Sequence, residues 1–250
     1  MSFLTSIFGK KKQEPIEDFI FVDMHSHLIP GIDDGSKSLD ESVELIQKLI
    51  KLGYKKIITS PHIMGDLYKN TPEIILSGLV ELKARLVAEN ISIEIEAAAE
   101  YYLDEWFIEK LNKAEPLMSF GVKEKYVLFE TSYMNEPAQL HQAIFLMRTL
   151  GYTPVLAHPE RYIYLYNDFA GFKKIYDMDV LFQVNLNSLA GYYSKSAKHF
   201  AEKLIDNNMV DFVGTDCHGI RHLEVLKQTK SSTYYKKLVK LNLLNNSLLS

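Results

Sequence analysis

Seven short runs rich in β-branched and aromatic residues alternate along the chain with longer stretches in which apolar residues recur every three to four positions. Several of the short runs, such as 20–22 and 155–157, are apolar without a break, which is typical of parallel strands buried on both faces. The alternation predicts a parallel α/β architecture with crossover helices. The expected strands are 19–24, 56–60, 92–98, 126–130, 153–157, 181–186 and 211–215.

Helical patterns fill the intervals between these runs. Ser38 and Glu41 have the spacing of a capping box at the start of the first helix. Pro72 and Pro137 are placed to open the second and third helices, because proline is favoured in the first helical turn. We expect further helices over 196–208, 222–230 and 233–248, and a mixture of helix and loop over 102–118 and 160–178.

The segment after the first strand separates the two common arrangements of such a sheet. An open, doubly wound sheet that binds nucleotides has a glycine-rich phosphate loop there, whereas this chain has His25-Ser26-His27. This difference favours a closed barrel, for which 250 residues is an ordinary length. Because we find no linker, repeat or low-complexity tract, we expect one domain over residues 19–250, preceded by a flexible leader over residues 1–18.

The leader begins with a short apolar run that is followed by three lysines. A secretory signal peptide has the opposite order, so we do not expect export. Two interpretations of residues 1–12 stay open: a disordered leader, or a small amphipathic segment that contacts a membrane surface. In the second interpretation, one face would hold Phe3, Leu4, Ile7 and Phe8.

Composition excludes several classes of protein. The single cysteine, Cys217, rules out a disulfide within the chain and is consistent with a reducing compartment. No stretch approaches the ~20 apolar residues that a membrane-spanning helix needs. The net charge of −4 provides no general attraction to nucleic acid. We therefore expect a cytoplasmic protein with at most peripheral membrane contact through residues 1–12.

Polar residues of the kinds that bind metals follow almost every expected strand. The carboxyl ends of parallel barrel strands form one face, on which active sites lie. These residues are His25, His27, Asp33 and Asp34 after the first strand, His62 after the second, Glu100 after the third, Glu130 at the end of the fourth, His158 after the fifth, Asn185 and Asn187 near the end of the sixth, and Asp216 and His218 after the seventh.

The residue types indicate the chemistry. In an extended segment, His25 and His27 point to the same side, and Asp216 and His218 repeat that geometry with a carboxylate. Imidazoles and carboxylates suit Mn, Fe or Zn. Several carboxylates together can hold more than one divalent ion, and adjacent ions activate a water and bind the oxygens of a phosphoryl group. The set predicts a polynuclear metal site that hydrolyses phosphate esters.

Each of these residues has a simpler explanation when it is considered alone. A strand-end carboxylate often caps the next helix, and a single histidine is more often packed or exposed than bound to metal. His141, His199 and His222 lie in helical patterns, so we do not expect them to be ligands. The prediction therefore depends on the whole set in strand order.

Two arginines lie close to the expected donors. Arg161 follows His158 by three residues, and Arg221 follows His218 by three. A guanidinium beside metal ions can bind a phosphate through two hydrogen bonds. The alternative for Arg161 is a surface salt bridge with Glu160.

Cys217 is the only candidate for a cysteine nucleophile. A phosphatase of that type needs an arginine six residues after the cysteine, and Leu223 occupies that position. We therefore expect Cys217 to be a buried packing residue and the nucleophile to be a metal-activated water.

The motifs resemble those of the PHP (polymerase and histidinol phosphatase) superfamily, and more narrowly the bacterial protein-tyrosine phosphatases of the CpsB/YwqE type from capsule and exopolysaccharide loci. The resemblance runs in order from about residue 20 to residue 220. It rests on the segments DMHSHLIPGIDDG (23–35), TSPH (59–62), AEYY (99–102), LFE (128–130), LAHPERY (156–162) and GTDCH (214–218).

The resemblance implies a distorted (β/α)7 TIM-like barrel and a cluster of two or three metals, usually manganese. It implies that Arg161 binds the substrate phosphate, and that the substrate is phosphotyrosine on a membrane-associated bacterial tyrosine autokinase that regulates polysaccharide synthesis. The implied metal ligands are His25, His27, Asp34, His62, Glu100, Glu130, His158, Asp216 and His218.

One position departs from the family pattern. Relatives often have a phosphate-binding arginine five residues after the last histidine, where this chain has Leu223, and Arg221 is the nearest substitute. Two other functions stay open: a small-molecule phosphatase of the histidinol-phosphatase kind, and a metal-stabilised module that binds without catalysis. For a phosphatase, the expected rim of the site includes Tyr101, Tyr102, Tyr133, Tyr162 and Tyr164, which either stack on a substrate ring or pack against each other.

Overall fold

The computed structural model describes residues 20–166 and 168–249, and its strands follow the seven expected runs. The predicted leader, residues 1–18, lies outside the described residues. Two of the runs are extended by a second short strand that the sequence did not suggest. The strands are β1 Val22–Asp23, β2 Lys56–Thr59, β3 His62–Ile63, β4 Glu94–Ala97, β5 Glu100–Tyr102, β6 Tyr126–Glu130, β7 Thr153–Ala157, β8 Leu181–Asn185 and β9 Phe212–Gly214.

The strands form two parallel sheets, ordered β1-β2-β4 and β3-β5-β6-β7-β8-β9. After short breaks, β3 continues the path of β2, and β5 continues that of β4. Backbone hydrogen bonds carry the pairing across both breaks, from Ala98 N to Thr59 O (2.8 Å) and from Glu100 N to Pro61 O (3.1 Å). The nine strands therefore occupy seven positions around the structure.

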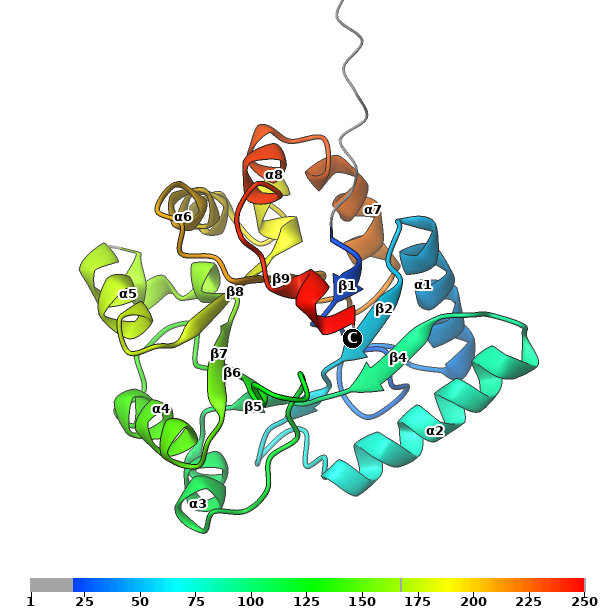
Figure 1. The fold of residues 1–250 in the computed structure, drawn as a ribbon, viewed down its shortest axis with the longest axis horizontal. Coiled ribbons are helices and arrows are strands. Elements are labelled where there is room, and N and C mark those ends of the chain that lie inside the picture. Colours follow the sequence, from blue (N-terminus) through cyan, green and yellow to red (C-terminus); the bar gives the residue numbers. More distant parts are fainter. Residues whose placement is uncertain (1–19, 167, 250) are drawn as a thin grey trace, which may run out of the picture.

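The last strand returns to the first. Residues Ser26 and Cys217 form an isolated parallel bridge, with hydrogen bonds from Asp216 N to His25 O (2.8 Å) and from His27 N to Cys217 O (3.0 Å). Figure 1 shows the strands around a common centre with the helices outside them. The predicted α/β fold of the TIM-like type is confirmed, and a single bridge in place of a regular ladder makes this side of the ring irregular.

The helices occupy the predicted intervals, with two differences: Pro137 does not open the third helix, which begins at Leu140, and the last interval is divided. Ser38 caps the first helix, accepting a hydrogen bond from Glu41 N. The expected helix over 233–248 is instead a short α-helix followed by a separate 3-10 turn. The helices are α1 Leu39–Lys51, α2 Pro72–Ala88, α3 Glu105–Asn112, α4 Leu140–Thr149, α5 Phe169–Tyr176, α6 Lys195–Asp206, α7 Ile220–Thr229 and α8 Thr233–Leu238, with 3-10 turns η1 Pro159–Arg161, η2 Ile163–Leu165, η3 Leu186–Ala190 and η4 Asn245–Leu249.

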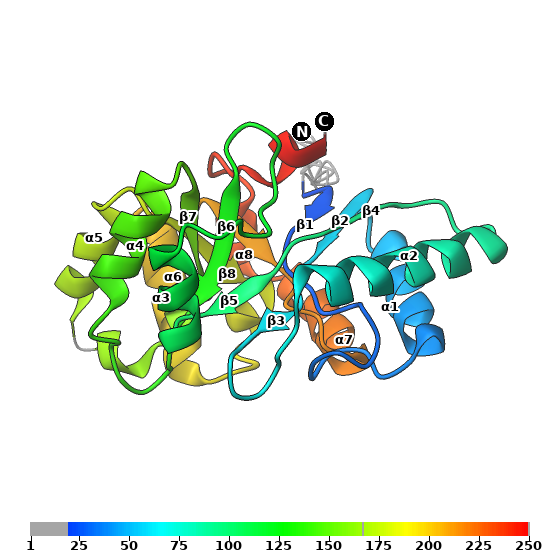
Figure 2. The ribbon, with the colours of Figure 1, turned by 90° about the horizontal axis from the view of Figure 1, so that it is seen from below.

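Two apolar cores support this arrangement. The larger lies between the strands and the surrounding helices, and a smaller one, which includes Val22, Leu128 and Phe212, fills the inside of the ring. At the amino-terminal ends of the strands, Asn245 of η4 donates to Val22 O (3.0 Å) and Val213 O (2.7 Å). Figure 2 shows η4 at that end of the ring. The opposite end, where the strands finish, is thereby left for polar residues.

None of the helices in the described part of the chain is both long and apolar enough to cross a membrane.

Candidate metal centre

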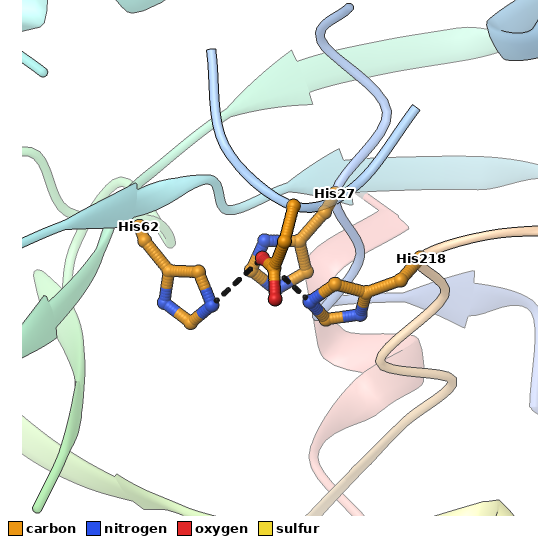
Figure 3. A group of neighbouring side chains, drawn as sticks. His27, His62 and His218 are labelled. Carbon is orange, nitrogen blue, oxygen red and sulfur yellow. Dashed lines mark ion pairs between the residues drawn. The ribbon is translucent and has the colours of Figure 1, made fainter. Parts of the chain in front are cut away.

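The nine residues expected to bind metals lie together at the carboxyl ends of the strands. They form four overlapping groups, in each of which one donor atom per residue lies within 4.8 Å of the others. Figure 3 shows three of the histidines pointing toward one another. The groups are His27, Asp34, His62 and His218; His25, His27 and Asp216; His25, Glu100 and His158; and His62, Glu100 and Glu130.

The two histidines of the first motif face each other through their Nε2 atoms, 3.3 Å apart. Their Nδ1 atoms are engaged elsewhere: that of His25 lies 2.8 Å from Gln183 Oε1, and that of His27 lies 2.8 Å from Asp33 Oδ2. Since both acceptors lack a proton, each Nδ1 carries the N–H, and in the neutral ring each Nε2 has a lone pair. Two lone pairs at this distance, with carboxylates beside them, require a positive charge between them.

Glu100 lies at the centre of the cluster. Its buried Oε2 is 3.1 Å from His62 Nδ1, 3.3 Å from His25 Nε2 and 3.5 Å from His27 Nε2. Neither Glu100 Oε2 nor His62 Nδ1 has a hydrogen-bond partner in the described residues. Buried polar atoms that make no hydrogen bond are rare and costly. Their convergence on one space fits a divalent cation, which would satisfy them together.

The two adjacent aspartates have different positions. Asp34 Oδ1 lies 3.5 Å from His62 Nε2 and 3.3 Å from His218 Nε2, so it belongs to the donor cluster. Asp33 points to His27 instead, and its Oδ2 also accepts a hydrogen bond from His62 N (3.1 Å). This agrees with the resemblance, which implies Asp34 as the donor, and it gives Asp33 an orienting contact.

The pKa shifts within the cluster also indicate that positive charge stabilises it. Burial disfavours the charged form of His25, but Glu100 and Asp216 outweigh it and raise the pKa of this imidazole. Burial likewise opposes ionisation of Glu100, yet His25 and His62 hold the pKa of its carboxyl well below the usual value. When no metal is present, protons supply the positive charge between these carboxylates and imidazoles. A metal ion that binds there would displace the protons.

Two donors have a strained backbone. His158 and Asp216 both adopt left-handed conformations, with φ of 33° and 48°. Such conformations cost ~1–3 kcal/mol in a residue other than glycine and tend to cluster at functional sites. At the ends of β7 and β9, they turn both side chains toward the cluster.

Arg161 lies beside the cluster and is held on three sides. Its guanidinium carbon is 4.5 Å from the centre of the Tyr133 ring and 4.2 Å from that of Tyr193. One guanidinium nitrogen is 3.2 Å from Asp216 Oδ2. The side chain of Glu160 is buried and accepts from Ser188 Oγ (2.6 Å), so a surface pair between Arg161 and Glu160 does not describe this structure.

Arg221 lies in a less enclosed position. It is exposed at the start of α7, and its guanidinium carbon is 5.7 Å from the centre of the Tyr192 ring. Between the last two donors, Cys217 is fully buried, as expected, and burial raises the pKa of its thiol. A thiol that resists ionisation is a poor nucleophile.

The expected tyrosine rim is wrong at two positions. Tyr101 is buried against Phe107, and its hydroxyl accepts from Met118 N (2.8 Å). Tyr162 is also buried, and its hydroxyl donates to Ala157 O (2.9 Å). Both rings are therefore part of the core, while Tyr133 does contact Arg161.

Sequence reasoning missed the chemical surroundings of the donors. It did not suggest the contacts of Gln183 and Tyr193, because neither lies in one of the motifs. Gln183 binds His25, and the Tyr193 hydroxyl lies 3.2 Å from Asp216 Oδ2. The alternation of β8 offers one signal: Gln183 and Asn185 are polar residues on one face of a strand that is otherwise apolar.

Comparison with known proteins agrees with this geometry. Tyrosine-protein phosphatase YwqE of Bacillus subtilis (strain 168) is 28% identical over 200 residues, which cover 80% of this chain and 78% of YwqE. The putative tyrosine-protein phosphatase CapC of Staphylococcus aureus is 28% identical over 223 residues, which cover 87% and 86% of the two chains.

A solved structure matches most of the fold. It comes from crystal structures of YwqE from Bacillus subtilis and CpsB from Streptococcus pneumoniae, described as unique metal-dependent tyrosine phosphatases. The match has a TM-score of 0.79 and 26% identity, and it covers 91% of this chain and 94% of the other. A family model described as "Capsular polysaccharide synthesis, CpsB/CapC" matches residues 21–240. The resemblance expected from the motifs is confirmed, and the chain belongs to the CpsB/CapC family of capsular polysaccharide synthesis.

Proposed function

We propose that this protein is a metal-dependent protein-tyrosine phosphatase. The observation that carries the proposal is the convergence of nine donors around buried atoms that make no hydrogen bond, above all Glu100 Oε2. Relatives that cover most of the chain are named as tyrosine phosphatases, and the matching solved structure is described as metal-dependent.

The nine donors would hold two or three divalent ions, with manganese as our first choice and iron or zinc as alternatives. When bound, the ions supply positive charge to the phosphoryl group and lower the pKa of the attacking water. Among the donors, the carboxylates of Asp34, Glu100, Glu130 and Asp216 contribute four negative charges. Two divalent ions balance that charge, and a third is favoured when a phosphate dianion enters.

Arg161 would bind the phosphate of the substrate. Its planar guanidinium can donate two hydrogen bonds to one phosphate. The rings of Tyr133 and Tyr193 restrict its rotation, so little side-chain entropy is lost when phosphate binds. The ion pair with Asp216 places the guanidinium next to the donor cluster. Arg221 is the candidate for a second, more exposed phosphate contact.

The proposed substrate is phosphotyrosine on a membrane-associated bacterial tyrosine autokinase that controls capsular or exopolysaccharide synthesis. The family to which the chain belongs and the names of its relatives support this choice. Dephosphorylation would return the kinase to its starting state. We propose that the enzyme acts in the cytoplasm, a reducing compartment in which its single cysteine, Cys217, would stay a thiol.

The test begins with protein freed of metal by a chelator and then supplied with Mn²⁺, Fe²⁺ or Zn²⁺. We expect hydrolysis of p-nitrophenyl phosphate and of a phosphotyrosyl peptide only after metal is restored, with Mn²⁺ the most effective. Turnover of histidinol phosphate at a rate equal to or above that of the peptide would instead favour a small-molecule phosphatase. Metal binding without hydrolysis of any of the three would favour a non-catalytic module.

A further inference from the structure

Two buried amides on β8 connect donors that come from three other strands. Gln183 and Asn185 are both fully buried, and their side chains point into the ring. β8 pairs with β7 on one side and with β9 on the other. His158 follows β7, Asp216 follows β9, and His25 follows β1.

Gln183 determines which nitrogen of His25 faces the cluster. Its Oε1 lies 2.8 Å from His25 Nδ1 and also accepts a long hydrogen bond from His158 N (3.4 Å). With the proton of His25 committed to Nδ1, the lone pair of Nε2 points toward Glu100 and Asp216, at 3.3 and 3.4 Å. Histidines that bind metals are commonly oriented in this way through the second nitrogen.

Asn185 determines which oxygen of Asp216 faces the cluster. Its Nδ2 donates to Asp216 Oδ2 (2.6 Å), which also contacts Tyr193 and Arg161. The other oxygen, Oδ1, lies 3.4 Å from His25 Nε2 and 3.5 Å from His27 Nε2. Asn185 thereby keeps Oδ2 on the side of Arg161 and leaves Oδ1 on the side of the histidines.

The two amides also bind each other and support the strained residues. Gln183 Nε2 donates to Asn185 Oδ1 (2.9 Å), which fixes the orientation of both amide groups. The left-handed residues of the cluster, His158 and Asp216, each contact one of the two amides. A continuous buried path therefore runs from His25 through Gln183 and Asn185 to Asp216.

We propose that Gln183 and Asn185 are positioning residues of the metal centre: the path His25–Gln183–Asn185–Asp216 presents His25 Nε2 and Asp216 Oδ1 to the same cation. This inference rests on the proposed metal site. It assigns no metal contact to the amides themselves. Their effect acts through the two donors and should appear in the affinity for metal, measured without substrate.

The experiment measures Mn²⁺ binding to the full chain by isothermal titration calorimetry, with the bound metal counted by elemental analysis. Gln183→Met keeps the size of the side chain and removes the acceptor, and we expect affinity to fall by roughly 10- to 100-fold at one site. Gln183→Glu keeps the acceptor for His25 Nδ1 but replaces the donor to Asn185 Oδ1 with a second acceptor, so we expect an intermediate loss of roughly 3- to 10-fold.

Asn245→Leu is the matched control. Asn245 is an equally buried amide that binds the backbone of β1 and β9 at the opposite end of the ring. Its loss should lower the melting temperature, as the loss of any buried hydrogen-bonded amide does, and leave Mn²⁺ affinity unchanged. Circular dichroism and thermal unfolding report whether each variant is folded.

The outcomes separate the inference from the function on which it rests. A wild-type chain that binds no divalent metal would overturn both. A wild type that binds Mn²⁺, with a folded Gln183→Met variant of equal affinity, would overturn the inference alone. If Gln183→Met does not fold, Asn185→Leu decides, because it removes the donor to Asp216 Oδ2: a loss of about tenfold in a folded protein supports the path, and wild-type affinity overturns it.

Discussion

Three of the five clustered histidines have Nδ1 engaged by a neighbouring oxygen. His25 binds Gln183, His27 binds Asp33, and His218 Nδ1 lies 3.0 Å from the carbonyl oxygen of Asp216. In His25 and His27, Nε2 is the atom that faces the other donors, whereas His218 faces Asp34 through Nε2 and Asp216 Oδ1 through Nδ1. Two of these contacts come from residues that are not donors, Gln183 and Asp33. A single-residue change can therefore either remove a donor or disturb a residue that orients one.

His158→Ala removes a donor. His158 Nε2 lies 3.1 Å from Glu100 Oε1, and its Nδ1 has no hydrogen-bond partner in the described residues. We expect the Mn²⁺-supported turnover of p-nitrophenyl phosphate to fall by roughly 100-fold or more, because incomplete metal coordination removes charge stabilisation of the transition state. His141→Ala, on the exposed surface of α4, is the control and should keep full activity. A fully active His158→Ala variant would contradict the proposed site.

Arg161→Lys keeps the positive charge and removes the planar pair of donors. Lysine also stacks less well between Tyr133 and Tyr193. We expect KM for a phosphotyrosyl peptide to rise by roughly 10- to 100-fold, the equivalent of about 1.4–3 kcal/mol, with a smaller change in kcat. Arg148→Lys, on the surface of α4, provides the comparison. Steady-state kinetics with an unchanged KM for Arg161→Lys would remove this arginine from the phosphate site.

At the scale of elements, β9 passes very close to the first metal-binding motif. A Cβ atom on Gly214 would lie 2.6 Å from His25 Cβ and 3.0 Å from Gln183 Nε2. Contacts of that kind between carbon atoms essentially do not occur in folded proteins, so one strand must shift. Glycine at this position lets β9 and the segment after β1 approach closely enough for their donors to meet.

Gly214→Ala should therefore weaken both the fold and the site. We expect a loss of stability of about 1–3 kcal/mol from overpacking, together with weaker Mn²⁺ binding because His25 is displaced. Gly219→Ala is the control, since the nearest atom to its added Cβ is Glu41 Oε1 at 3.9 Å. Thermal unfolding and metal titration of both variants provide the check, and equal behaviour of the two would show that β9 tolerates the extra methyl group.

The elements also show how far sequence reasoning extends. Continuous apolar runs predicted β6 and β7 to the residue, because both are buried on both faces. The breaks that separate β2 from β3 and β4 from β5 were not predictable. They depend on how the strands bend around the common centre, and no local signal except Pro61, which lacks an N–H, marks them.

In the site, too, features with a local sequence signal were predictable, and features that depend on the three-dimensional fold were not. The types and order of its donors follow from the motifs, and the structure places all nine in one cluster. The contact of Gln183 with His25 joins residues 158 positions apart and depends on the three-dimensional register of β8. The burial of Tyr101 and Tyr162 likewise depends on how the loops fold over the strand ends.

At the scale of the whole molecule, the cluster links the stability of the fold to the binding of protons and of metal. Burial lowers the pKa of His62, but Glu100 outweighs it, and the net effect raises that pKa from 6.5 to about 10. A group whose pKa is raised by folding stabilises the fold fully below its unfolded value, and this contribution is lost as pH rises toward the folded value. For metal-free protein, the loss spans about pH 6.5 to 10.

The expected result is a melting temperature of metal-free protein that falls as pH rises from 7 to 8.5. Bound Mn²⁺ replaces the protons, so metal-saturated protein should show a smaller fall, and the stabilisation by metal should grow with pH. Thermal unfolding of chelator-treated and Mn²⁺-saturated protein at several pH values measures both. A melting temperature of metal-free protein that rises between pH 7 and 8.5 would contradict the raised pKa of His62.

The bridge between Ser26 and Cys217 has a consequence for how the protein is made. It joins segments about 190 residues apart, and the donors on both sides of it belong to one group, His25, His27 and Asp216. A ribosome synthesises the first segment long before the second. During most of its synthesis the nascent chain therefore has only part of this coordination shell, and a complete one forms only after the ring has closed. A metal ion held by this group should accordingly be captured only after the two bridged segments have met.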